Sequence, residues 1–88
     1  MTPSAPEFEL SEHARTVLVA RDIDVAWVAR ILSQPLRTED DPRDPSLRHA
    51  LGPIVERDGR VLRIVYNHAV QPVRLVTAFF DRRERRPQ

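Results

Sequence analysis

Apolar residues are spaced in two different ways along this 88-residue chain, and the change of spacing constrains its fold more than any other feature. In the first third they recur every three or four positions, as in helices with one buried face. This spacing predicts a helix over residues 12–20 with Ser11 as its N-cap. A second helix is expected to begin after Asp24 and to end before Pro35. Residues 8–10 alternate between apolar and acidic and predict a short strand.

The last third has the pattern of β-strands, because branched and aromatic residues fall there in short runs bounded by turn residues. Residues 54–57 lead into Asp58-Gly59, a strong signal for a two-residue hairpin, and residues 61–66 lead out of it. A second turn over 67–72 precedes a final strand over 73–80. The predicted order is β-α-α-β-β-β, an α+β fold with both helices packed on one face of an antiparallel sheet.

Residues 36–50 lie between these two parts and are predicted to form a loop. They are charged, interrupted by prolines and without an apolar period. The aspartates in this segment, Asp40, Asp41 and Asp44, lack the full spacing of a calcium-binding loop, so a solvated acidic loop is favoured over a cation site. We therefore predict neither a metal nor a cofactor.

The patterned part of the chain is expected to be one small domain over residues 7–81, with flexible tails at 1–6 and 82–88. The sequence contains no cysteine, which excludes disulfides, thiolate zinc ligands and cysteine nucleophiles. It also contains neither a signal-peptide pattern nor an apolar run approaching the ~20 residues of a membrane span. A cytoplasmic location without membrane partners is therefore expected.

All 14 basic residues are arginines, and they are unevenly distributed. Residues 1–44 hold 5 arginines and 9 acidic residues, whereas residues 45–88 hold 9 arginines and 4 acidic residues. The guanidinium group forms paired hydrogen bonds with phosphate, so the basic half favours a phosphate-bearing partner such as RNA. The alternative is that arginine simply replaces lysine on a solvated surface.

The predicted hairpins assign the residues of the sheet to its two faces, because alternate residues and cross-strand partners share a face. If Arg57 lies opposite Arg60 and Asn67 opposite Pro72, an apolar face is expected to pack on the helices, made of Val55, Leu62, Ile64, Tyr66, Val73, Leu75, Thr77 and Phe79. The other face is mixed and expected to be uncovered, made of Ile54, Glu56, Val61, Arg63, Val65, Arg74, Val76, Ala78 and Phe80.

On this mixed face, Arg63 and Arg74 are candidates for binding a phosphate, and Phe80 is a candidate for stacking on a base. The alternative is that the long arginine stems only cover apolar sheet surface while their heads remain in water. The exposed apolar residues of the same face, Val61, Val65, Val76 and Phe80, predict a patch through which the chain forms a homodimer.

His13 is the strongest candidate for acid–base chemistry, because it lies at the edge of the buried stripe in the first turn of the first predicted helix. Imidazole can both accept and donate a proton near pH 7, as RNA cleavage through the 2′-hydroxyl requires. Arg21 and Arg63 would supply cations for the phosphorane without a metal. The alternative for His13 is a structural hydrogen bond. His49 and His68 fall in predicted loops and turns and are not candidates.

Five motifs follow one another over residues 8–81: Phe8-x-Leu10-Ser11-x-His13-Ala14, Arg21-x-Ile23, Leu32-x-x-Pro35, Gly59-Arg60-x-Leu62-Arg63-Ile64-Val65-Tyr66 and Val76-Thr77-Ala78-Phe79. Together they resemble a family of small bacterial proteins, the domain-of-unknown-function family 4258, which is similar to the RelE-like toxins. The resemblance implies a RelE-like sheet with two N-terminal helices. It also implies a metal-independent endoribonuclease activity and an antitoxin partner.

The resemblance also implies roles for individual residues. His13, Arg21 and Arg63 match polar positions of the family pattern, and Tyr66 and Thr77 match its sheet positions, where they would bind substrate. The sequence departs from the pattern in lacking lysine, a residue type that many RelE-like toxins use on their RNA-binding face.

Asp22 is a second departure from the family pattern, which usually has glycine at this position. Aspartate still tolerates the left-handed backbone geometry that glycine would allow there.

Two classes of function follow from the sequence. The first is an RNA-cleaving, toxin-like enzyme with His13 as acid and base, Arg63 and Arg74 on the phosphate and Arg21 assisting. The second is a non-catalytic module whose open sheet face binds an antitoxin, a nucleic acid or a second copy of the chain.

Overall fold

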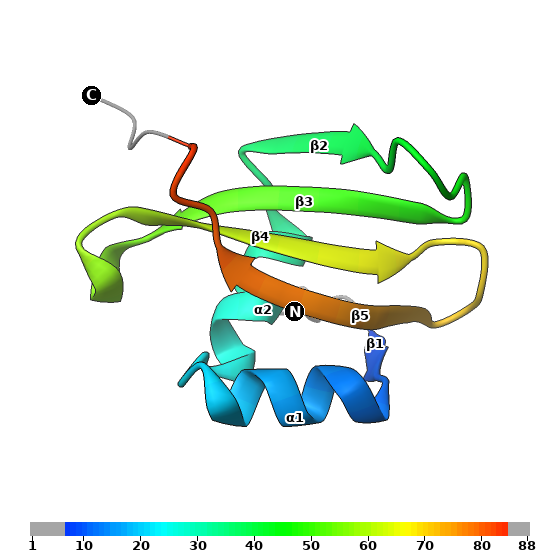
Figure 1. Cartoon of the computed structure of the whole chain (residues 1–88), viewed down its shortest axis with the longest axis horizontal. Coiled ribbons are helices and arrows are strands. Elements are labelled where there is room, and N and C mark those ends of the chain that lie inside the picture. Colours follow the sequence, from blue (N-terminus) through cyan, green and yellow to red (C-terminus); the bar gives the residue numbers. More distant parts are fainter. Residues whose placement is uncertain (1–6, 85–88) are drawn as a thin grey trace, which may run out of the picture.

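The computed structural model describes residues 7–84 and contains two helices and five strands (Figure 1). In chain order the elements are β1 (Phe8–Leu10), α1 (Glu12–Ala20), α2 (Val25–Ser33), β2 (Arg37–Asp40), β3 (Leu47–Ile54), a single 3-10 turn η1 (Val55–Arg57), β4 (Arg60–Asn67) and β5 (Val73–Phe80). The predicted α+β class is confirmed. Neither helix within residues 7–84 is long and apolar enough to span a membrane.

The five strands form one sheet in the order β1-β5-β4-β3-β2. β2 to β5 pair antiparallel, but β1 pairs parallel to β5, so the sheet is mixed and the expectation of a purely antiparallel sheet is wrong. The first and last strands of the chain thus lie side by side (Figure 1). Both helices cover the same face of the sheet, with α1 against β5 and α2 against β3.

The two helices begin where their capping residues predict. The Ser11 hydroxyl accepts a hydrogen bond from the backbone N–H of Ala14 at 3.0 Å, and the Asp24 carboxylate accepts one from Ala26 at 2.9 Å. Each cap satisfies an N–H group that the first helical turn leaves without an intrahelical partner. Between the helices, Asp22 has a φ of 55°, so its left-handed geometry is also confirmed.

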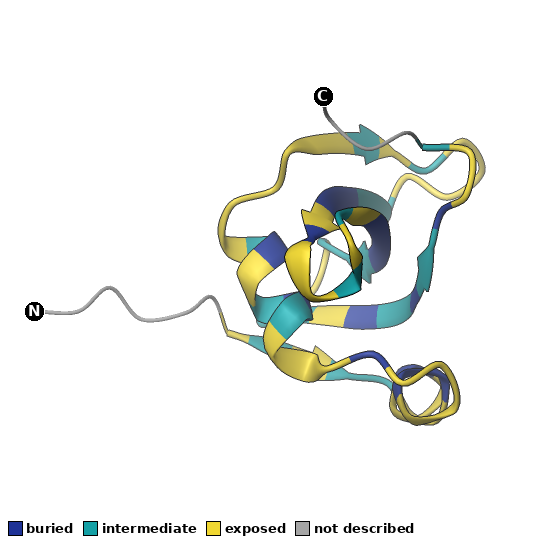
Figure 2. Cartoon of the chain, turned by 90° about the vertical axis from the view of Figure 1, so that its left-hand side faces the viewer, coloured by how far each residue is buried: buried dark blue, intermediate teal, exposed yellow. Residues whose placement is uncertain are grey.

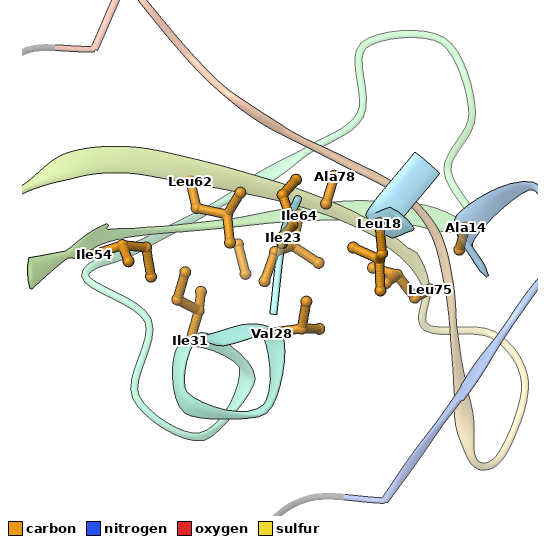
Figure 3. Packing of buried hydrophobic residues seen from close by; sticks show 11 residues of the cluster. Ala14, Leu18, Ile23, Val28, Ile31, Ile54, Leu62, Ile64, Leu75 and Ala78 are labelled. Carbon is orange, nitrogen blue, oxygen red and sulfur yellow. The ribbon is translucent and has the colours of Figure 1, made fainter. Parts of the chain in front are cut away.

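The core lies between the helices and the sheet (Figure 3). Its buried apolar side chains come from both helices, from the α1–α2 turn and from the three central strands: Ala14, Leu18, Ile23, Val28, Ile31, Ala50, Ile54, Leu62, Ile64, Leu75 and Ala78. Figure 2 shows the exposed residues on the outer sides of the helices and along most of β2. Burial of these apolar surfaces is the main source of stability for a fold of this size.

The predicted loop over residues 36–50 is wrong, because this segment contains β2 and the first half of β3. The two strands pair from Arg37 opposite Leu51 to Asp40 opposite Arg48. Apolar and polar residues do not alternate regularly in this segment, so the pattern that usually indicates a strand is missing. The two strands are held together by backbone hydrogen bonds, which leave no such pattern in the sequence. The connection between them is ordered by Asp41, which accepts hydrogen bonds from the next turn of the backbone.

The first hairpin also differs from the prediction, because its turn is longer. Ile54, and not Arg57, is the last residue that pairs across it, lying opposite Arg60. Residues 55–57 form η1, so Val55 is 78% exposed and Ile54 is fully buried in the core, the reverse of the predicted assignment. Asp58 and Gly59 complete the connection with φ values of 58° and 75°.

The second hairpin contains a β-bulge that changes the faces of β5. Tyr66 lies opposite Leu75, but Val65 lies opposite Thr77, so Val76 is an extra residue on β5. A bulge reverses the facing of every residue beyond it relative to regular pairing. Leu75, Ala78 and Phe80 therefore lie on the helical side, whereas Thr77 and Phe79 lie on the other. The predictions for Thr77, Phe79, Ala78 and Phe80 are wrong for this reason.

Candidate nucleic-acid interface

The residues that the sequence singles out lie in several parts of the molecule. His13 is exposed on α1 and makes no hydrogen bond within residues 7–84, whereas Arg63 lies on the opposite face of the sheet. Arg21, about 12 Å further along α1, donates to the backbone carbonyl of Ala78 at 2.7 Å. Arg74 pairs with Glu9 on β1 at 3.4 Å. The structure therefore does not bring the four predicted cationic and acid–base groups together around one phosphate.

Arg63 is buried in a network of carboxylates. Its Nε donates to Asp81 at 2.7 Å, one Nη donates to Glu39 at 3.1 Å and to His49 at 2.9 Å, and the other donates to Glu84 at 3.3 Å. Its side chain is only 9% exposed. At least four of the five guanidinium hydrogens are thus occupied. An arginine in this state has little capacity left for a phosphate.

His49 joins this network through both of its ring nitrogens. Arg63 can only donate, so Nδ1 accepts its hydrogen bond, and Nε2 must carry the proton that it donates to Asp41 at 2.7 Å. His49 is therefore neutral in this arrangement. His68 is also occupied, because its Nε2 donates to the carbonyl of Pro45 at 2.9 Å.

The pKa values of the network favour its charged form. Burial alone would raise the pKa of Asp81, but the hydrogen bond from Arg63 and a backbone N–H of Arg83 leave it lowered. The hydrogen bond from Arg63 likewise lowers the pKa of Glu39. Burial opposes ionisation of Arg63, yet its carboxylate partners raise its pKa. We infer that this network holds the face of the sheet together.

The C-terminal segment is part of the same network. Asp81 donates its backbone N–H to Val61, and Glu84 forms an ion pair with Arg37 of β2. The chain after β5 thus crosses the end of the sheet toward β2 (Figure 1). Residues 82–84, the start of the predicted tail, lie along this path, and residues 1–6 and 85–88 lie outside the described residues.

The predicted phosphate clamp of Arg63 and Arg74 does not form. Both arginines lie on the face away from the helices, as predicted, but Arg74 lies opposite Asn67, about 13 Å along β4 from Arg63. The predicted apolar patch is also absent, because Val61 and Val65 are only 4% and 7% exposed.

Tyr66 and Thr77 lie on opposite faces of the sheet. Tyr66 is partly buried against the core, as predicted from the pairing, and Thr77 lies opposite Val65 on the other face. The two side chains therefore cannot serve the same substrate group.

Arginine and aromatic side chains meet on the helical side of the sheet, where β5 ends beside the α1–α2 turn. The rings of Trp27 and Phe80 lie edge to face with centroids 6.4 Å apart. Arg57 lies 5.4 Å from the Trp27 ring and 6.0 Å from the Phe80 ring, and Arg60 lies 4.8 Å from the Phe80 ring. Together with Arg21, which binds the backbone two residues before Phe80, we call this group the Arg–aromatic cluster.

The cluster retains uncompensated positive charge. Arg57 is paired with Asp22 at 2.9 Å, but neither Arg21 nor Arg60 has a carboxylate partner within residues 7–84. Trp27 and Phe80 are both half-buried, with part of each ring packed on the core and part accessible. Exposed cations beside accessible rings can bind phosphates and stack on bases.

Sequence reasoning identified only two members of the cluster, Phe80 and Arg21. Trp27 lies at the edge of the core, packed against it. Arg57 and Arg60 were treated as the two ends of a hairpin turn. Their placement beside Phe80 depends on η1 and on the β5 bulge, neither of which has a sequence signal strong enough to predict it.

The fold and this surface define a small two-layer α+β protein with a cationic, aromatic site at one end of its sheet. Residues 10–80 match the family described as a domain of unknown function (DUF4258), and the chain belongs to that family. The match spans both helices and nearly the whole sheet. Comparison with curated proteins finds no match, and comparison with solved structures finds none either.

Proposed function

We propose that this protein binds single-stranded RNA through the Arg–aromatic cluster. The observation that carries the proposal is the position of Arg57 and Arg60 over the rings of Trp27 and Phe80. Aromatic rings and guanidinium planes stack on unpaired bases, while guanidinium hydrogens bind the phosphates between them. Paired bases in a duplex do not offer their faces for such stacking, so a single strand is the favoured ligand.

Binding can be measured by the fluorescence anisotropy of a labelled single-stranded RNA of mixed sequence. Arg60→Ala removes an arginine that has no carboxylate partner within residues 7–84, so we expect weaker binding. The slope of the logarithm of the binding constant against the logarithm of the salt concentration should become shallower by about 0.7. Phe80→Leu removes the ring but keeps an apolar side chain. Stacking contributes about 1–3 kcal/mol per base, so its affinity should fall about 5- to 150-fold.

Arg48→Ala is the matched control, because Arg48 lies on β3 and pairs with Asp40 outside the cluster. It removes the same charge and should leave affinity nearly unchanged. Circular dichroism checks that each variant is folded. Equal RNA affinity in the wild type, Arg60→Ala and folded Phe80→Leu would refute the proposed surface.

RNA cleavage is a second candidate function, and the state of His13 favours it. Of the three histidines, His49 and His68 are hydrogen-bonded, whereas His13 is exposed with both ring nitrogens free within residues 7–84. Such a group can take the proton of a 2′-hydroxyl and deliver one to the leaving 5′-oxygen. The resemblance to RelE-like toxins supports this function, and it also supports an antitoxin as partner.

Cleavage is tested by incubating RNA with the protein in EDTA and mapping the new ends. A 2′,3′-cyclic phosphate is expected, and His13→Asn should abolish it, whereas the matched His68→Asn should retain it. Cleavage that survives His13→Asn would exclude this role for His13. If the wild type bound RNA without cleaving it, the cleavage function would be excluded and only the RNA-binding function would remain.

A further inference from the structure

The segment that follows β5 separates its acidic side chains from its basic ones. Asp81 is buried and Glu84 is partly buried, and both carboxylates pair with Arg63. Arg82 and Arg83 belong to the same segment but are exposed. The buried network therefore neutralises the carboxylates of the segment, and the charge that the segment presents to solvent is positive.

The two exposed arginines keep most of their charge available for a ligand. Arg82 forms no ion pair within residues 7–84. Arg83 lies 3.5 Å from Asp81, but its side chain is 86% exposed. The same carboxylate already accepts a hydrogen bond from Arg63 at 2.7 Å. Such an exposed pairing contributes little free energy, so Arg83 can exchange it for another anion.

Backbone hydrogen bonds hold the segment in a defined turn. The N–H of Asp81 donates to the carbonyl of Val61 at 2.9 Å, and the N–H of Glu84 donates to the carbonyl of Asp81 at 3.2 Å. The N–H of Arg83 donates to the Asp81 carboxylate at 3.0 Å. The two arginines are thus carried by an ordered backbone, and a ligand that binds them pays less entropy for ordering the chain.

The segment is also continuous with the Arg–aromatic cluster. Phe80 is the last residue of β5, and the chain passes directly from its ring-bearing position into the turn (Figure 1). Asp81 continues the pairing with β4, since it lies beside Val61. Arg82 follows Phe80 by two residues, about 7 Å of chain at most. The rings and the exposed arginines therefore lie next to each other where β5 ends.

The neighbouring rings favour a nucleic-acid strand over an acidic protein segment at these arginines. Single-stranded RNA carries a phosphate beside every base, so a base that stacks on Phe80 brings phosphates close to the turn. An acidic protein segment would match the charge of the arginines but would have no base to stack on the rings.

We propose that Arg82 and Arg83 bind phosphates of the RNA strand whose bases stack on the Arg–aromatic cluster. This inference rests on the proposed RNA-binding function and extends its site along the strand. The rings bind bases, whereas the two arginines contact only the backbone. The arginines should therefore add affinity that depends on salt and not on base sequence.

The test measures the binding of labelled dodecaadenylate by fluorescence anisotropy at several salt concentrations, with the full chain and its Arg82→Gln, Arg83→Gln double variant. We expect weaker binding by the double variant. The slope of the logarithm of the binding constant against the logarithm of the salt concentration should become shallower by about 1.4, which is about 0.7 for each arginine. Phe80→Leu should weaken binding while leaving this slope nearly unchanged, because it removes stacking and no charge.

The matched control is the Arg43→Gln, Arg48→Gln double variant, which removes the same charge near the turn between β2 and β3, at the other end of the sheet (Figure 1). Its slope should equal that of the wild type, and an equal loss of slope in both double variants would overturn the inference. Circular dichroism checks that each variant is folded.

The remaining outcomes separate this inference from the proposed function. An unchanged slope in folded Arg82→Gln, Arg83→Gln, with binding still weakened by Phe80→Leu, would overturn the inference and leave the proposed function intact. Absence of RNA binding by the wild type would overturn both. If polyglutamate of equal charge competed as well as unlabelled dodecaadenylate, an acidic protein would fit the arginines equally, and their assignment to RNA would be overturned.

Discussion

Arg63 donates its Nε hydrogen to Asp81 at 2.7 Å, and the two side chains are only 9% and 3% exposed. Asp81→Ala takes the nearest carboxylate from the buried Arg63 and leaves it only Glu39 and Glu84, and breaking a buried ion pair is strongly destabilising. Asp81→Ala should therefore lower the free energy of unfolding by about 3 kcal/mol, measured by urea denaturation. Replacing both partners by apolar residues, as Arg63→Met with Asp81→Leu, should cost less than Asp81→Ala alone, because no buried charge then loses its nearest partner.

The exposed pair between Arg74 and Glu9 provides the comparison for this prediction. Its side chains are 54% and 53% exposed, and their atoms lie 3.4 Å apart. Solvent-exposed pairs contribute at most about 1 kcal/mol, so Glu9→Ala should change stability little. If Glu9→Ala and Asp81→Ala were equally destabilising, burial would not be the cause of the Arg63 effect.

Acid should destabilise the protein through the same network. The pKa of Glu39 is lowered in the folded state, chiefly by its hydrogen bond from Arg63. For Asp81 the largest single influence is burial, which raises the pKa, but the hydrogen bonds from Arg63 and the Arg83 backbone and the nearby arginine charges together leave it lowered. At low pH the unfolded chain therefore binds more protons than the folded one. The stability is fully present above the unfolded pKa values near 4 and is lost as the pH falls through the lower folded values.

The measurement is the midpoint of urea denaturation between pH 6 and pH 2. The urea concentration at the wild-type midpoint should decrease as the pH is lowered below about 4. The Arg63→Met, Asp81→Leu double variant should show a shallower decline, because it lacks Asp81 and the arginine that lowers the pKa of Glu39. An identical decline in both proteins would assign the acid sensitivity to other carboxylates.

The helices could be predicted from sequence because their signals are local. Ser11 and Asp24 cap the helices that follow them, and the apolar stripes that face the core lie within the same few turns. Such patterns depend on residues three or four positions apart. The left-handed geometry of Asp22 was expected from the family resemblance, because the family usually has glycine at this position.

The sheet was predicted less well because its register depends on residues far apart in the sequence. One bulge at Val65/Tyr66 reverses the facing of the end of β5, and one 3-10 turn moves Ile54 into the core. The partners of Arg63 are separated from it by 14 to 24 residues. No spacing rule links such positions, so neither the buried network nor the Arg–aromatic cluster could be assembled from the sequence.

Gly52 tests the packing between α2 and β3. A Cβ atom at this position would lie 3.2 Å from a side-chain carbon of Ile31, so the helix and strand are close here. Gly52→Leu should force the two elements apart and cost about 1–3 kcal/mol of stability. Gly52→Ala requires Ile31 to move by only a few tenths of an ångström and should cost less, which thermal denaturation of the two variants would show.

Asp22 allows the charge of the cluster to be changed without touching an arginine. Its carboxylate pairs with Arg57 at 2.9 Å, and its backbone has a φ of 55°. Asp22→Gly removes the carboxylate and suits the backbone, since glycine adopts this geometry without a steric penalty. Arg57 is then free to bind a phosphate, so we expect tighter RNA binding. The slope of the logarithm of the binding constant against the logarithm of the salt concentration should become steeper by up to about 0.7.

Asp22→Ala separates the electrostatic effect from the backbone effect. It also removes the carboxylate, but alanine at positive φ carries a strain of about 1 kcal/mol that glycine avoids. The two variants should therefore bind RNA equally tightly while differing in thermal stability, with Asp22→Gly the more stable. Because Arg57 also donates to the Asp22 carbonyl, which both variants keep, its side chain should remain beside the rings. If the less stable Asp22→Ala bound RNA more weakly than Asp22→Gly, the affinity would depend on stability and not on the removed charge. The ion pair with Asp22 would then not be what restricts phosphate binding by Arg57.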